Sequence, residues 1–134
     1  MSNAGAFGLP NTALAGPVFT RAYVSPDQTL TAAGALTLAH GLGAPPKIVH
    51  YALKCVTTDA AYPVGAILDL GSDLRSAYNH ADGSIGGMGV RIDDAVNIVI
   101  RFNSTLNVAA PHATTGAATT LTNASWRLVV KAYA

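Results

Sequence analysis

Apolar and polar residues alternate along several short segments of the chain, and the clearest alternation runs from Trp126 to Tyr133. One side of this segment carries Trp126, Leu128 and Val130, and the other side carries Arg127, Val129, Lys131 and Tyr133. Because successive side chains of a strand point to opposite faces of a sheet, this pattern predicts a strand with one face in the core. We expect this strand to complete the sheet.

Similar patterns predict about eight or nine short strands separated by turn signals. The expected strands span residues 18–24, 36–38, 47–57, 64–70, 88–92, 96–102, 106–109, 118–121 and 126–133. Both faces of residues 47–57 are mainly apolar, which predicts a central strand. Asp93 and Asp94 are expected to form the turn of the clearest hairpin. The pattern predicts an all-β, antiparallel β-sandwich with a jelly-roll-like arrangement over residues 18–134.

Two segments lack this alternation. Residues 1–17 contain glycine and proline without a sustained period, and they predict an extended N-terminal arm. Such an arm could reach about 55 Å, far enough to lie across a neighbouring subunit. Residues 71–89 are rich in Ser, Asn, Asp and Gly, which predicts a long loop.

Composition narrows the class of protein. Only 11% of residues are charged, against about 25% in typical soluble domains, so other subunits are expected to cover much of the surface. All seven acidic residues are Asp, which argues against long surface helices. The net charge of +1 and the scattered basic residues give no electrostatic reason to bind nucleic acid or an acidic membrane. No run approaches the roughly 18 apolar residues of a membrane span, so we expect no membrane insertion. A single cysteine, Cys55, and no signal peptide predict folding in a cytoplasm.

Residues that could carry chemistry do not form a recognisable site. The four histidines are not spaced as metal ligands: His40, His50, His80 and His112. The glycine-rich segment 83–89 lacks the Lys-Ser/Thr of a phosphate loop, and no nucleophile motif accompanies a serine. We therefore predict no catalytic residue, no metal and no cofactor. The alternative from another class is a small hydrolase or lyase that binds a metal through these histidines.

Aromatic residues could line a groove for a carbohydrate or a receptor, because their flat faces stack on apolar ligand surfaces. The candidates are Tyr51, Tyr62, Tyr78, Tyr133 and Trp126. Trp126 starts the last strand on its core side, so we interpret it as a core residue. Tyr78 is the candidate that the pattern leaves plainly exposed.

The order of these segments resembles a small β-domain that recurs in virion proteins of tailed bacteriophages. The resemblance rests on segments 40–49, 53–58, 62–65, 90–102 and 126–133 in this order, and it covers about residues 36 to 134. Such domains occur at the C-terminal ends of tail fibres and as small separate virion proteins. The resemblance implies a non-enzymatic assembly protein, most often a homotrimer, located in the virion after assembly in the host cytoplasm. Its partners would be other virion proteins.

The absence of a fibre shaft favours a capsid decoration protein on the head surface over the alternative, a tail-fibre or tail-tip protein that binds a host receptor. The subunit interface is expected to include Phe7, Leu9, Leu14, Val129 and Tyr133. In the alternative, an exposed recognition loop would present Arg75, Tyr78, Asn79 and His80.

Overall fold

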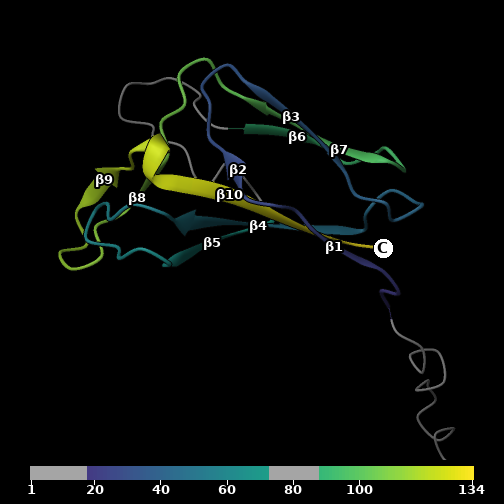
Figure 1. Cartoon of the computed structure of the whole chain (residues 1–134), viewed down its shortest axis with the longest axis horizontal. Coiled ribbons are helices and arrows are strands. Elements are labelled where there is room, and N and C mark those ends of the chain that lie inside the picture. Colours follow the sequence, from purple (N-terminus) through teal and green to yellow (C-terminus); the bar gives the residue numbers. More distant parts are fainter. Residues whose placement is uncertain (1–17, 73–87) are drawn as a thin grey trace, which may run out of the picture.

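A computed structural model describes residues 18–72 and 88–134, which form an all-β structure (Figure 1). Its strands are β1 (Ala22–Val24), β2 (Gln28–Thr29), β3 (Ala35–Ala39), β4 (Ile48–Cys55), β5 (Ile67–Gly71), β6 (Met88–Arg91), β7 (Asn97–Phe102), β8 (Ala109–Pro111), β9 (Ala118–Thr120) and β10 (Trp126–Tyr133). One 3₁₀ turn, η4 (Asn123–Ser125), precedes β10. All strand pairs are antiparallel. The predicted all-β, antiparallel sandwich is confirmed.

The larger sheet contains five strands and is built around β10. Its order is β1-β10-β4-β5, and β2 also pairs with β10. All eight residues of β10 pair with β4, from Trp126 opposite Cys55 to Tyr133 opposite Ile48. The prediction that residues 47–57 form a central strand is therefore confirmed, because β4 has a neighbour on each side.

The smaller sheet, in the order β3-β7-β6, packs face to face against the five-stranded sheet (Figure 1). The predicted hairpin around Asp93 and Asp94 is its β6–β7 pair. A separate two-stranded sheet, β8 and β9, lies at one end of the sandwich (Figure 1).

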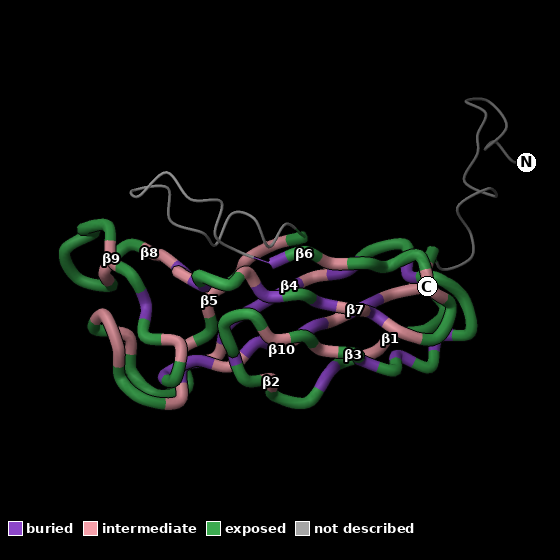
Figure 2. The backbone as a smooth tube through the Cα atoms, turned by 90° about the horizontal axis from the view of Figure 1, so that it is seen from above, coloured by how far each residue is buried: buried purple, intermediate pink, exposed green. Residues whose placement is uncertain are grey.

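The core lies between the two packed sheets. The side chains of Leu53, Ile98, Ile100, Trp126 and Leu128 are completely buried there. Buried and half-buried residues alternate along the whole of β10, as the sequence pattern predicts (Figure 2). Burying side chains of this size is the main favourable contribution to folding, about 1.5–3 kcal/mol for each one.

Three predicted strands begin later than the pattern predicts. The predicted strand 18–24 begins only at Ala22. The predicted strand 64–70 begins only at Ile67, because residues 63–66 form a turn in which Ala66 N–H donates to Pro63 O and Gly65 has φ +93°. The predicted strand 106–109 begins at Ala109, and Leu106 instead contributes a buried side chain before it. In these last two cases the pattern fails because apolar residues also occur outside strands, in an exposed turn at Val64 and in a buried segment at Leu106.

Several predictions fall outside the described residues. The predicted arm, including Phe7, Leu9 and Leu14, lies there. So do Arg75, Tyr78, Asn79 and His80 of the predicted recognition loop.

Candidate functional site

The face of the five-stranded sheet that points away from the core is the broadest surface formed by regular strands, and we call it the outer face. The strand register places the following residues on it: Val24, Ile48, His50, Ala52, Lys54, Ile67, Asp69, Arg127, Val129, Lys131 and Tyr133. These residues alternate with core residues of the same strands. The predicted interface residues Val129 and Tyr133 are therefore brought onto one surface, and both are half-buried.

Large apolar side chains are exposed across the outer face. Ile67 retains 61%, Val24 59% and Ile48 43% of its accessible surface. They come from three different strands, so the exposed apolar surface spans the width of the sheet. Ala52 lies opposite Val129 at the centre of the face. Its side chain is small and buried, so it projects little from the sheet.

Charged groups are interspersed with these apolar residues. Lys54 Nζ lies 3.1 Å from Asp27 Oδ2, and His50 Nε2 lies 2.8 Å from Asp69 Oδ1. Lys131 is the cross-strand neighbour of His50. Within the described residues, the side chain of Lys131 makes no hydrogen bond or salt bridge, and its positive charge acts on Asp69.

The carboxylate of Asp69 is held in its charged form. The backbone N–H of Gly71 donates to Asp69 Oδ1 at 2.6 Å, and His50 contacts the same oxygen. The Gly71 hydrogen bond, then the His50 contact and the nearby charges of His50 and Lys131, lower the pKa of Asp69. The outer face therefore presents a fixed negative charge beside a basic strand.

Tyr133 has a neighbour from its own chain. The ring of Phe19 lies 5.8 Å from that of Tyr133, between ring centroids, at an interplanar angle of 47°. Phe19 thus covers part of the Tyr133 ring, whereas Val129 lies further along β10 at the centre of the face. We place the centre of the candidate surface at Val129.

A second polar cluster joins the β8–β9 end to the sandwich. Asp59 Oδ2 accepts hydrogen bonds from Thr122 N–H at 2.7 Å and from the indole Nε1 of Trp126 at 3.0 Å. Tyr62 packs edge-on against Trp126, with ring centroids 5.6 Å apart, and its hydroxyl donates to Pro111 O at 2.6 Å. These contacts are all internal, so we interpret the cluster as structural.

The environment of Asp59 affects its ionisation in two directions. Burial raises the pKa of its carboxyl group, but the hydrogen bonds from Thr122, Trp126 and Ala60 together outweigh burial. The net pKa is lowered, because donors directed at a carboxylate stabilise its charged form. Asp59 is consequently an anion that fixes the buried indole.

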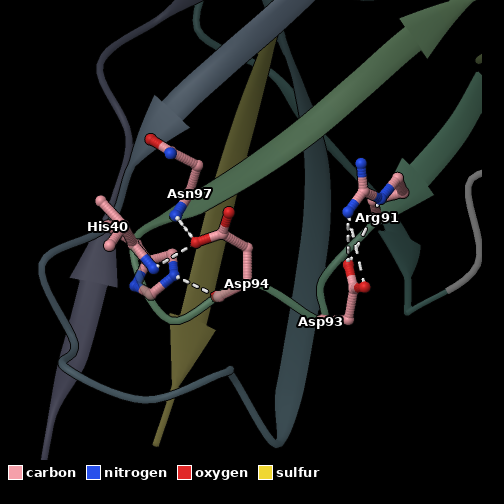
Figure 3. Close-up of polar contacts among 6 residues, drawn as sticks. His40, Arg91, Asp93, Asp94 and Asn97 are labelled. Carbon is pink, nitrogen blue, oxygen red and sulfur yellow. Dashed lines mark hydrogen bonds and ion pairs between the residues drawn. The ribbon is translucent and has the colours of Figure 1, made fainter.

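His40 is buried, and its ring makes hydrogen bonds within the described part of the chain, so we interpret it as a structural residue. Its Nδ1 accepts from Leu42 N–H at 3.1 Å. Its Nε2 lies 3.1 Å from Asp94 O (Figure 3). Both ring nitrogens are occupied. The other described histidines are far from it in the fold, since His50 lies on the outer face and His112 lies in the β8–β9 turn. Among the described residues, no group of three or more His, Cys, Asp or Glu could hold a metal ion.

Asp93 and Asp94 are turn residues, as predicted. Asp94 Oδ1 accepts from Val96 N–H at 2.6 Å and from Asn97 N–H at 3.1 Å, which closes the turn between β6 and β7 (Figure 3). These two backbone bonds lower the pKa of Asp94, and the charges of Arg91 and His40 add to the effect. Asp93 pairs with Arg91 at 3.2 Å, and both side chains are largely exposed.

The aromatic candidates do not form an open groove in the part of the chain that the structure describes. Tyr51 and Trp126 are buried, and Tyr62 packs on Trp126. Tyr133 is on the outer face, and Tyr78 lies outside the described residues. Trp126 is the core residue that the sequence pattern predicts.

Comparison of the chain with models of protein families, with curated proteins and with solved structures finds no match. Within residues 18–72 and 88–134, no helix has the length and hydrophobicity that crossing a bilayer requires.

Proposed function

We propose that this protein is a non-enzymatic structural protein of a tailed-bacteriophage virion, and that it decorates the capsid surface as a homotrimer. The supporting observation is the outer face, where Ile67, Val24 and Ile48 expose large apolar side chains next to Lys131 and Asp69. Exposed apolar patches rimmed by charges are typical of protein–protein interfaces. The order of sequence segments supplies the resemblance to phage virion domains.

The proposal gives the outer face a specific role. Val129 lies at the centre of this face, between the basic residues Arg127 and Lys131 on the same side of β10. In a trimer, an apolar centre would be buried between subunits, and the surrounding charges would select the partner and its orientation. Acidic Asp69 and Asp27 and basic Lys131 and Arg127 supply both signs on one subunit.

The test is the mass of the purified protein and of two variants, measured by size-exclusion chromatography with light scattering. Val129→Asp should abolish the trimer, because its carboxylate would be buried at the interface. The thermal unfolding midpoint of dilute, dissociated protein should change little, because the side chain points away from the core. The matched control is Val96→Asp, an exposed valine at the β6–β7 turn, which should remain trimeric. A monomeric wild type at all concentrations, or a trimeric Val129→Asp, would contradict the proposal.

Immunogold labelling of intact particles tests the location. Label distributed over the head supports the decoration protein. Label confined to the tail instead favours the tail-fibre or tail-tip protein that binds a host receptor, and particles without label contradict both.

A further inference from the structure

The edges of the two packed sheets differ in how well they are protected against pairing with another strand. On the five-stranded sheet, β1 and β2 are very short and flank Pro26, and β5 carries Asp69 and an irregular register with β4. On the three-stranded sheet, β6 carries the charged Arg91. Short strands, prolines, charges and bulges all discourage pairing at an edge. The edge strand β3 has none of these features, since its residues are Ala, Leu, Thr, Leu and Ala.

The backbone of β3 presents hydrogen-bonding groups at this edge that no other described residue uses. Phe102 N–H donates to Gly34 O, and His40 N–H donates to Val96 O, both at 2.9 Å. Hydrogen-bonded pairs recur every second residue of an antiparallel ladder, so the even-numbered residues of β3 direct their backbone groups to β7. The N–H and C=O groups of Ala35, Thr37 and Ala39 therefore point to the open edge, and all three residues are exposed.

The sequence of β3 is a palindrome centred on Thr37. If a second copy pairs with β3 antiparallel about a two-fold axis at Thr37, identical residue types meet at every position. Thr37 lies opposite Thr37, Ala35 opposite Ala39, and Leu36 opposite Leu38. Residues 35, 37 and 39 then form three hydrogen-bonded pairs, which satisfy all the open backbone groups of the strand.

The neighbouring strand β7 is compatible with this pairing. Arg101 pairs with Ala35, and Asn97 pairs with Ala39. Across the two-fold axis, Ala35 of one copy would lie opposite Ala39 of the second copy. Arg101, Ala35, Ala39 and Asn97 would then lie side by side on four neighbouring strands, in one cross-strand row. The arginines of the two copies therefore lie in different rows, and no charged residue faces its own equivalent. Leu36, which is only half-buried in one chain, would gain cover from Leu38 of the second copy.

We propose that two copies of this chain pair through β3 about a two-fold axis at Thr37, which joins two three-stranded sheets into one six-stranded sheet. The occupant of this edge is a second copy rather than an unrelated strand, because the palindrome makes the strand complementary to itself. This contact is separate from the outer face and does not depend on the proposed function. If all three subunits of a trimer pair in this way with one second trimer, the closed particle has twice the mass of the trimer.

The charge at position 37 tests the two-fold axis directly. Thr37→Lys and Thr37→Glu each place like charges opposite one another, so the mass of each variant should be half that of the wild type in sedimentation over a concentration series. We expect the dissociation constant to rise by up to about fivefold, so the series should span concentrations around the wild-type dissociation constant. An equimolar mixture of the two variants should regain the wild-type mass, because lysine then faces glutamate. Thermal unfolding of dilute, dissociated protein should be the same in wild type and both variants, since residue 37 is exposed.

A crosslink provides the second measurement. Thr37→Cys places two thiols on residues whose Cα atoms would be about 5.5 Å apart, within reach of a disulfide. Val99→Cys is the control, because Val99 pairs with Thr37 on β7 and its two copies would be about 14 Å apart. The native Cys55 is buried. Mild oxidation should link Thr37→Cys into a covalent dimer and leave Val99→Cys unlinked.

The proposal is overturned if wild type and both charged variants have the same mass. It is also overturned if the mixture does not regain the wild-type mass, or if Val99→Cys crosslinks as readily as Thr37→Cys. Loss of the trimer in Val129→Asp with retention of β3 pairing would separate this contact from the one at the outer face.

Discussion

Asp59 and Trp126 lie 67 residues apart in the chain, and the indole Nε1 of Trp126 donates a 3.0 Å hydrogen bond to Asp59 Oδ2. The indole is completely buried, so this carboxylate is the partner of a donor that has left water. The same oxygen accepts from Thr122 N–H, which ties the β8–β9 end to β10. Long-range polar contacts of this kind hold the end of the sandwich in place.

Replacing Asp59 should destabilise the protein. Asp59→Ala leaves the buried Trp126 N–H and the Thr122 N–H without an acceptor, and the expected loss in the free energy of unfolding is about 1–3 kcal/mol. Chemical denaturation followed by the fluorescence of Trp126, the single tryptophan, measures it. Asp27→Ala is the control, because it removes only an exposed pair with Lys54 and should cost about 0–1 kcal/mol. Equal losses in the two variants would contradict the role of Asp59.

Acid should weaken the fold through Asp59. The folded-state pKa of Asp59 lies below its ordinary value of 3.8, so the folded state binds fewer protons than the unfolded state in this range. The stabilisation is therefore present above pH 3.8 and is lost as the pH falls through the lower folded-state pKa. Asp69 and Asp94 also have lowered pKa values, but Asp69 is exposed and Asp94 is only half-buried. Denaturation at several pH values should show a smaller acid loss in Asp59→Asn than in wild type, and an identical slope would argue against this assignment.

His40 should contribute to stability through its two hydrogen bonds. His40→Ala removes the acceptor of the buried Leu42 N–H and the donor to Asp94 O, with an expected cost of about 1–3 kcal/mol in denaturant. His112→Ala removes turn contacts to Thr114 that remain open to water, so its cost should be below about 1 kcal/mol. The assignment of His40 as a structural residue fails if it tolerates alanine as well as His112 does.

The two faces of β10 should respond differently to the same substitution. Leu128→Ala empties a completely buried position and should cost about 2–5 kcal/mol. Val129→Ala, on the outer face, should cost less than about 1 kcal/mol in the monomer. Thermal unfolding of dilute protein measures both, and similar losses would mean that the outer face is packed within a single chain.

The sequence predicts those parts of the fold that depend on local alternation. From Trp126 to Tyr133, each side chain lies on the predicted face, and the β6–β7 hairpin turns at Asp93 and Asp94 as predicted. Alternation misplaced the start of β5, because Val64 and Ala66 continue the apolar pattern through a turn that Gly65 makes with φ +93°.

Contacts between distant segments could not be predicted from the sequence. The Asp59–Trp126 bond depends on how the segment after β4 folds back on β10, and no local signal distinguishes Asp59 from the other six aspartates. The His50–Asp69 pair depends on the register between β4 and β5, which shifts beside Ala52. The sequence pattern did place Val129 and Tyr133 together, because both lie on one strand and two-residue periodicity is sufficient.

The central position of β10 determines the order in which the chain can fold. Strands β1 and β4 do not pair with each other, because β10 lies between them and pairs with both. As a ribosome makes the chain, residues 22–24 and 48–55 emerge long before the strand that joins them. The five-stranded sheet can therefore close only after residues 126–133 have left the ribosome, so that folding is late and depends on long-range pairing.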